Sequence, residues 1–211
     1  MRMRKKKNLI PRMEKAGEYL FEIGEKSGLS AKDIFDREAS LYIEVGCGKG
    51  RFLCEQAKRH PDRVFVGVER VPDVLVLAME KAQEYELKNI RVMSVDAAKL
   101  GEVFAENCAA GIYLNFSDPW PKARHAARRL DGPDFLNIYK YLLKPDAVLE
   151  MKTDNVGFFE FGLESVEQVG GTILDISRDL TAENRPENIV TEYEQRWSDM
   201  GIKINYLKVS F

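Results

Sequence analysis

The stretch Leu41-Tyr42-Ile43-Glu44-Val45-Gly46-Cys47-Gly48-Lys49-Gly50 decides the fold of this chain. Its first five residues form a short run of mostly apolar side chains, which is typical of a buried strand. Three glycines then alternate with other residues, and the amphipathic stretch that follows, residues 51–59, predicts a helix. A strand, a glycine-rich turn and a helix in this order indicate the first unit of a parallel sheet.

The rest of the chain repeats this alternation of short apolar runs and longer amphipathic stretches. We expect strands at residues 41–45, 64–68, 90–95, 111–116, 147–151, 172–176 and 204–210, and helices at residues 51–59, 72–85, 132–143, 156–169 and 192–200. Residues 12–36 are expected to be helical and to cover one edge of the sheet. The predicted class is α/β, with a mostly parallel, seven-stranded sheet flanked by helices.

Length and composition predict one compact domain. The chain has 211 residues, of which 45% are hydrophobic and 31% charged. Within residues 1–211 we expect a basic N-terminal arm (1–15), an N-terminal helical segment (16–40) and the α/β core (41–211). No apolar run is long enough to span a membrane and no signal peptide is evident, so the expected location is cytoplasmic. The three cysteines form no CxxC pair, and neither a disulfide framework nor a metal site is predicted.

Positive charge is concentrated in two places, although the formal net charge is −2. Residues 1–15 hold seven basic side chains and one acidic side chain, and a second cluster in mid-chain consists of Lys122, Arg124, Arg128 and Arg129. Such clusters are often only solvated surface, but they are also the usual contacts for phosphates.

The glycine-rich turn and the strand ends predict a cofactor without phosphates. The dinucleotide pattern GxGxxG requires a third glycine where this chain has Arg51, and the carboxylate of Glu44 would repel a diphosphate but attract a cationic ligand such as a sulfonium. Glu69 follows the second strand and suits the two hydroxyls of a ribose, while Asp96 follows the third and suits the adenine amine. This arrangement resembles the Rossmann-like class of S-adenosylmethionine-dependent methyltransferases.

The segment after the fourth predicted strand carries the components of RNA recognition. It reads Ser117-Asp118-Pro119-Trp120-Pro121-Lys122-Ala123-Arg124-His125-Ala126-Ala127-Arg128-Arg129-Leu130. Two prolines stiffen the chain around Asp118 and Trp120, and cations follow directly. An aromatic ring for a base, an acid for its edge and cations for the phosphates are what an RNA site needs.

This segment closely resembles the Asp-Pro-Trp-Pro-Lys-x-Arg-His-x-x-Arg-Arg-Leu motif of bacterial tRNA (guanine-N7-)-methyltransferases, and the likeness covers about residues 41 to 205. It implies a Rossmann-like methyltransferase fold and transfer of a methyl group from S-adenosyl-L-methionine to N7 of a guanine in the tRNA variable loop, which forms 7-methylguanosine. The implied partners are tRNA and the cofactor, without a membrane, and the protein would be a monomer or a homodimer.

The resemblance also implies roles for individual residues. The implied cofactor-binding residues are Glu44, Gly46, Gly48, Gly50, Glu69, Asp96, Ala97 and Asp118, of which Asp118 is the catalytic residue. The implied substrate-binding residues are Trp120, Lys122, Asp154, Thr191, Glu192, Tyr193 and Glu194. The implied RNA contacts are Arg124, His125, Ala126, Ala127, Arg128 and Arg129. Ser117 departs from the usual proline of the family, and Ala123, Ala126 and Ala127 stand where Lys or His is common.

Several alternatives stay open on the sequence alone. Trp120 could fill the core, Asp154 could cap the next helix and Tyr193 could be a packing residue. Asp118, Asp154 and Glu194 are three candidates for the contact with the guanine edge. An NAD-linked oxidoreductase and a non-catalytic tRNA-binding protein are the rival functions, and cofactor binding would distinguish them.

Overall fold

The structure is a computed structural model that describes residues 8–211, apart from the side chain of Glu192. The first half of the predicted basic arm, residues 1–7, lies outside the described residues. The chain forms two compact units, one up to Ala105 and one from Glu106 onward, and each is described by itself below.

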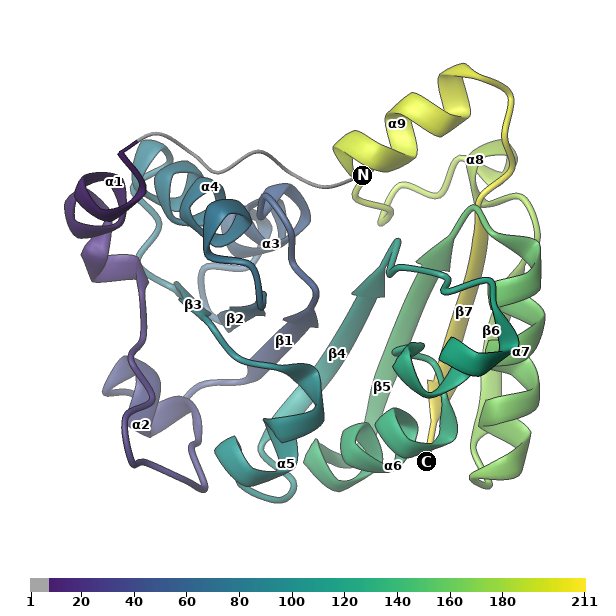
Figure 1. The fold of residues 1–211 in the computed structure, drawn as a ribbon, viewed down its shortest axis with the longest axis horizontal. Coiled ribbons are helices and arrows are strands. Elements are labelled where there is room, and N and C mark those ends of the chain that lie inside the picture. Colours follow the sequence, from purple (N-terminus) through teal and green to yellow (C-terminus); the bar gives the residue numbers. More distant parts are fainter. Residues whose placement is uncertain (1–7) are drawn as a thin grey trace. The chain divides into compact units, whose positions relative to one another are not determined.

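The first unit is built on three parallel strands in the order β3-β2-β1 (Figure 1). These are β1 (Leu41–Val45), β2 (Val64–Val68) and β3 (Ile90–Met93), and the helices are α1 (Leu9–Lys15), η1 (Gly17–Tyr19), α2 (Ala31–Phe35), α3 (Arg51–Arg59), α4 (Pro72–Glu84), η2 (Ala97–Lys99) and α5 (Leu100–Val103). Val45 pairs with Val68, and Val68 pairs with Met93, so the three strands end level. Residues that follow them therefore gather at one edge.

The second unit contains four strands in the order β4-β5-β7-β6. These are β4 (Ala109–Asn115), β5 (Leu143–Thr153), β6 (Thr172–Ser177) and β7 (Asn205–Ser210), and the helices are η3 (Ala123–Arg128), α6 (Pro133–Leu142), α7 (Val156–Gln168), α8 (Leu180–Glu183) and α9 (Glu192–Asp199). Strands β4 and β5 are parallel, whereas β7 runs antiparallel to both β5 and β6. In Figure 1, α9 lies on the side toward which β4 and β5 point.

These strands and helices confirm the predicted α/β class with seven mostly parallel strands. Strands β1 and β2 and helix α3 have the predicted bounds. Strand β5 begins at Leu143 instead of at residue 147, because Leu143 pairs with Ala109 and an irregular stretch precedes the pairing of Val148 with Gly111. The stretch contains Pro145, and bulged residues of this kind do not follow the period-two pattern from which strands are predicted.

The expectation that residues 12–36 are helical holds only for part of this range. Helix α1 ends at Lys15, η1 covers Gly17–Tyr19, and the chain then runs without a helix until Ala31. Gly24 and Gly28 have φ angles of 58° and 64°, a left-handed conformation that ends a right-handed helix. Two isolated bridges, Leu20 with Val92 and Leu29 with Phe104, attach this segment to the first unit.

An acidic side chain lies inside the second unit. Asp131 is fully buried just before α6, and among the described residues neither of its carboxylate oxygens has a hydrogen-bond partner. Gly162 on α7 packs so closely that a Cβ there would lie 2.9 Å from Asp131 Oδ2. Burial raises the pKa of the Asp131 carboxyl to about 7, since an ionised carboxylate is poorly solvated inside a protein.

This buried acid predicts a specific dependence of stability on pH. The unfolded chain releases the Asp131 proton near pH 4, whereas the folded protein keeps it up to about pH 7, so the free energy of unfolding falls as the pH rises through this window. We expect Asp131→Asn to remove this part of the fall, which urea unfolding at pH 4.5 to 8 measures. Asp62→Asn, on an exposed loop, is the control. Parallel pH curves for Asp131→Asn and the wild type would contradict the prediction.

Candidate functional site

The glycine-rich turn after β1 holds three residues in the left-handed conformation. Gly46, Gly48 and Gly50 have φ angles of 77°, 55° and 73°, which other residues rarely adopt. A Cβ on Gly48 would meet only the carbonyl oxygen of Gly46 at 4.0 Å, whereas a Cβ on Gly50 would lie 2.7 Å from Cβ of Ala78 on α4. Gly48 therefore leaves open space for a ligand, and Gly50 allows α3 and α4 to pack.

Three carboxylates lie at the ends of the three parallel strands of the first unit. Glu44, in β1, is 2% exposed, while Glu69 and Asp96 follow β2 and β3 and are half-buried. Glu69 Oε1 accepts a hydrogen bond from the backbone N–H of Val71 (2.9 Å). Asp96 Oδ1 caps η2, whose first residue is Ala97, by accepting from Ala98 N (3.0 Å). Asp96 Oδ2 also forms an ion pair with the exposed Arg70 (3.3 Å). Local contacts thus fix the positions of Glu69 and Asp96, and three carboxylates lie at this edge of the sheet.

The turn after β4 exposes Asp118. Phe116 N donates to the carbonyl oxygen of Lys152 on β5 (2.8 Å), and Phe116 itself has a φ of 54°, so the chain leaves the sheet sharply at this point. Ser117 and Pro119 beside it are half-buried, while the Asp118 side chain is open to solvent. A carboxylate on a backbone held in this way can meet a ligand from solution.

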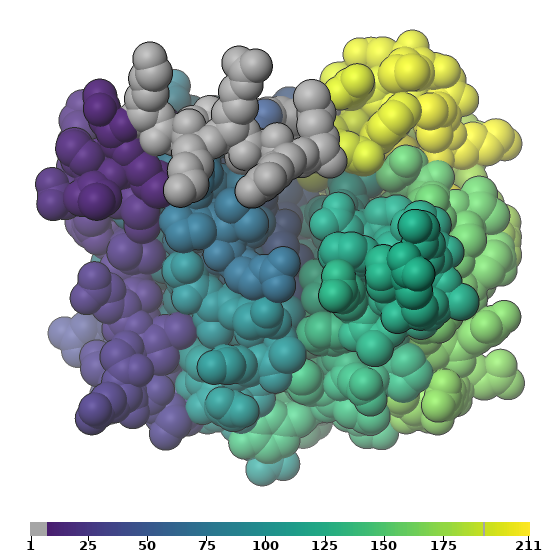
Figure 2. All heavy atoms as spheres, in the orientation of Figure 1, coloured from purple at the N-terminus to yellow at the C-terminus, as the bar shows by residue number. Residues whose placement is uncertain are grey.

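Trp120 organises the basic segment that follows. Its carbonyl oxygen accepts hydrogen bonds from the Arg129 guanidinium (3.2 and 3.4 Å), its ring meets the His125 ring edge-on at 5.6 Å, and the Arg128 guanidinium lies 4.9 Å from its centroid. Cation–π and aromatic contacts of this kind hold η3 in place. Lys122, Arg124 and Arg128 are exposed, and the loop lies on the face turned to the viewer in Figure 2, in teal-green.

A buried ion pair joins β5 to α9. Lys152 Nζ, 5% exposed, donates to Glu194 Oε2 (2.7 Å), to Asn188 Oδ1 (3.1 Å) and to the carbonyl oxygen of Ile189 (2.8 Å). Asn188 Nδ2 in turn donates to the other Glu194 oxygen (2.6 Å). The three donors of the ammonium group are thereby satisfied, as a buried charge requires.

Thr191 and Glu194 also cap α9. Thr191 Oγ1 accepts from Glu194 N (2.9 Å), and Glu194 Oε2 accepts from Thr191 N (3.4 Å), which together form a capping box. Both carboxylate oxygens of Glu194 therefore have protein partners. Of the three candidates for the guanine contact, Glu194 is the most buried, at 1% exposed, and the choice between Asp118, Asp154 and Glu194 stays a prediction.

Tyr193, at the start of α9, belongs to a row of three aromatic rings. Its ring lies 5.0 Å from Phe116 and 5.5 Å from Trp197, and it is 44% exposed. The ring packs on one side and is open on the other, as an aromatic surface for a ligand would be.

Asp154 follows β5 and is half-buried. The cap of the next helix, α7, is Asn155, whose Oδ1 accepts from Phe158 N (2.8 Å). Asp154 is therefore not needed as the cap, and its carboxylate stays a candidate for binding.

Two important residues are absent from the predicted site. Lys152 follows the fifth predicted strand without an assigned role, and Phe116 is only the last residue of the fourth predicted strand. The signal for Lys152 is its position, because a lysine at the end of a buried strand requires an acidic partner. No comparable signal marks Phe116, since an aromatic residue in a strand is common.

All three cysteines are buried free thiols. Burial raises the pKa of the Cys47 thiol well above its usual value, and those of Cys54 and Cys108 to about 12 and about 11, which disfavours the reactive thiolates. Residues 8–211 contain no cluster of three or more His, Cys, Asp or Glu side chains suited to a metal ion. None of their helices is long and apolar enough to cross a membrane.

Known proteins resemble this chain in both sequence and fold. A family model described as "Putative methyltransferase" matches residues 38–207. A tRNA (guanine-N(7)-)-methyltransferase of Macrococcus caseolyticus is 45% identical over 85% of each chain, and one of Geobacillus thermodenitrificans is 44% identical over 82% of this chain and 80% of its own. The chain belongs to the tRNA (guanine-N7-)-methyltransferase family.

Solved structures show the same fold at low sequence identity. An antibiotic-related methyltransferase aligns with a TM-score of 0.63 and 18% identity, over 91% of this chain and 98% of its own. A geranyl diphosphate C-methyltransferase in complex with S-adenosyl-L-homocysteine aligns with a TM-score of 0.56 and 15% identity, over 94% of this chain and 74% of its own. The predicted Rossmann-like methyltransferase fold is confirmed.

Two alanine substitutions in the glycine-rich turn test why glycine is needed at each position. Gly50→Ala combines left-handed strain of about 1–2 kcal/mol with a clash against Ala78 that costs about 1–3 kcal/mol. Gly48→Ala has the strain without the clash. We expect Gly50→Ala to lower the free energy of unfolding clearly more than Gly48→Ala, as measured by urea unfolding without ligand. Equal losses would show that packing against α4 does not explain Gly50.

Proposed function

We propose that this protein transfers a methyl group from S-adenosyl-L-methionine to N7 of a guanine in the variable loop of tRNA, forming 7-methylguanosine. The observation that carries the proposal is the exposed Asp118 on the constrained turn after β4, followed by the basic segment with Lys122, Arg124 and Arg128. The names of the relatives support the same reaction.

The residues of the first unit fit the cofactor. The open space at Gly48 admits a ligand close to the backbone, and Glu44 is a buried carboxylate beside the turn, which suits a cationic group. Glu69 would hold the ribose hydroxyls and Asp96, with Ala97, the adenine. Bound there, the cofactor would supply an activated methyl group, which is its contribution to the chemistry.

The reaction needs no strong base in the protein. Guanine N7 carries an in-plane lone pair at neutral pH, so it attacks without first losing a proton. The protein's tasks are therefore to orient the purine, exclude water and stabilise the positive charge that develops on it. In this proposal Asp118 accepts hydrogen bonds from guanine N1–H and its exocyclic amine, which selects guanine over adenine, and its negative charge stabilises the cationic product. Asp154 is the second candidate for this contact.

The target base has to leave its stack before it reacts. N7 faces the deep and narrow groove of A-form RNA, which side chains do not enter, so the guanine must be unstacked or in a loop. The open ring of Tyr193 offers a surface against which an extruded base packs, and the exposed cations of the basic segment offer contacts for the phosphates on either side.

The two rival functions fit the site less well. An NAD-linked oxidoreductase would need a diphosphate beside the turn after β1, where Glu44 is acidic and Arg51 begins α3 in place of the third glycine. A protein that only binds tRNA would have no use for three acids at the ends of β1, β2 and β3.

The proposal is tested by incubating the protein with unmodified tRNA and labelled S-adenosyl-L-methionine and identifying the methylated nucleoside by mass spectrometry. 7-Methylguanosine is the expected product. Another methylated nucleoside, or none at all, would overturn the proposal.

Asp118→Asn tests the catalytic role. The amide keeps the shape but loses the charge and presents a donor to the donors of guanine, so we expect turnover to fall by about two to three orders of magnitude, as when one preorganised electrostatic contact is removed. Asp146→Asn, at an exposed position in the irregular first part of β5 in the same unit, is the control and is expected to retain full activity.

The cofactor affinity and thermal unfolding of Asp118→Asn are measured on the same samples, and both are expected to stay close to wild type. A near-normal turnover would exclude Asp118 as the catalytic residue and make Asp154 the next candidate.

A further inference from the structure

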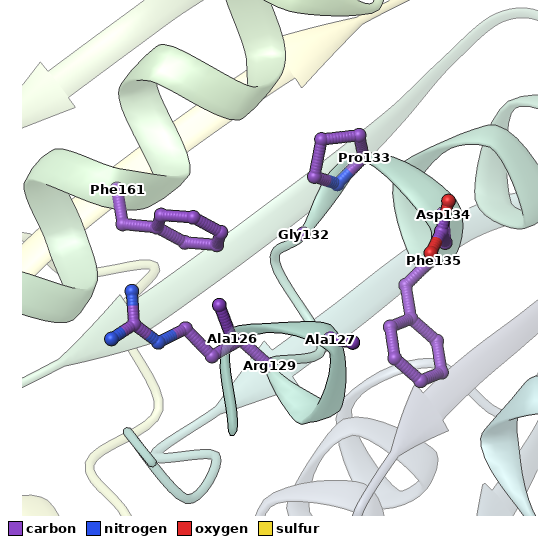
Figure 3. A pocket seen from close by; sticks show the side chains of 8 residues that line it. All are labelled: Ala126, Ala127, Arg129, Gly132, Pro133, Asp134, Phe135 and Phe161. Atoms are coloured by element: carbon purple, nitrogen blue, oxygen red, sulfur yellow. The ribbon is translucent and has the colours of Figure 1, made fainter. Parts of the chain in front are cut away.

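A small cavity opens beneath the basic segment of the second unit. It has a volume of about 120 Å³ and is lined by Ala126, Ala127, Arg129, Gly132, Pro133, Asp134, Phe135 and Phe161. Figure 3 shows Phe161, from α7, and Phe135, from α6, on opposite sides of it, with the two alanines of η3 between them. We propose that this cavity binds one unpaired base of the tRNA substrate, other than the guanine that is methylated.

The walls of the cavity suit a flat aromatic ring. Apolar surface is provided by Phe135, Phe161 and Pro133. Gly132 has no side chain that would occupy the cavity; a Cβ there would lie 3.1 Å from the carbonyl oxygen of Arg129 and 3.7 Å from the Phe161 ring. The Arg129 guanidinium stacks on Phe161, 4.4 Å from the ring centroid. The guanidinium covers this face of Phe161, so a base in the cavity would stack on the guanidinium plane itself or on the Phe135 ring, and bases of any sequence stack on such surfaces.

The size of the cavity favours a single ring system over a larger ligand. Pockets for drug-sized molecules measure roughly 300–1,000 Å³. A cavity of about 120 Å³ holds only a small part of such a molecule, but one base whose sugar and phosphate stay outside needs no more. The proposed occupant therefore keeps its backbone on the surface.

The charges around the cavity match a polyanion. Arg129 lies in its wall, and the exposed Arg124 and Arg128 belong to the same segment, η3 and the residue after it. The one acid of the lining, Asp134, is exposed at the start of α6 and can accept a hydrogen bond from a base amine. Cations for the phosphates beside an apolar slot for the base distinguish an RNA site from a slot for a protein side chain.

Two alanines explain why the cavity exists. Ala126 and Ala127 line the cavity between Phe135 and Phe161, and their short side chains leave this space open. The proposal rests on the proposed function, because it takes tRNA as the substrate.

The test fills the cavity without changing any charge. Ala126→Leu places three extra carbons in the slot, and Asn137→Leu, on the exposed surface of α6 outside the lining, is the matched control. The affinity for unmodified tRNA is measured by fluorescence anisotropy at several salt concentrations, and each variant is checked by thermal unfolding.

We expect Ala126→Leu to weaken tRNA binding about tenfold, the effect of losing one stacked base, with an unchanged slope against salt because no cation is lost. Asn137→Leu should bind like the wild type. Phe161→Leu, which removes the aromatic ring but little volume, should also weaken tRNA binding. If Ala126→Leu fails to fold, the tRNA affinity of Phe161→Leu is the test of the proposal.

Wild-type affinity in Ala126→Leu, or in Phe161→Leu where that variant decides, would overturn the proposal and leave the cavity as a packing defect. A weaker affinity with a flatter salt slope would also overturn it, since the variant would then have displaced the cations. This outcome is distinct from a failure of the proposed function, in which the wild-type protein itself would neither bind nor methylate tRNA.

Discussion

The buried contact between Lys152 and Glu194 is the interaction on which the substrate side of this protein depends. Lys152 lies near the end of a strand, and Glu194 lies one turn into α9, so their contact connects the sheet to a helix that otherwise packs through Tyr193 and Trp197. Through the capping box, the same glutamate fixes Thr191 and the start of α9. Tyr193 consequently stays against Phe116, two residues before Asp118.

Charge is separated along the chain although the formal net charge is only −2. The ends of β1, β2 and β3 carry acids, and the segment after β4 carries cations. Each unit therefore carries charges opposite in sign to those of its proposed ligand. A sulfonium is attracted to the first, and phosphates are attracted to the second. This separation is why a chain without overall positive charge can still be a tRNA enzyme.

The sequence predicted the class of fold and the residues at the strand ends, because both follow from short-range patterns. The bounds of β1 and α3 follow from an apolar run, a glycine turn and an amphipathic stretch. The roles of Lys152 and Glu194 were not predicted, since 42 positions separate the two residues and only the folded chain brings them together. The non-helical segment around Gly24 and Gly28 was missed because its contacts with Val92 and Phe104 are also distant in sequence.

The Lys152–Glu194 contact is tested most directly by a double-mutant cycle in the free energy of unfolding. Lys152→Met leaves a buried carboxylate and Glu194→Gln leaves a buried ammonium group, and breaking a buried pair from one side costs about 3–5 kcal/mol. Glutamine still completes a capping box, so the double variant buries no unpaired charge and should lose much less than the sum of the two single losses. Losses that simply add would show that the two charges do not stabilise each other, and that the ion pair is not what holds α9 to the sheet.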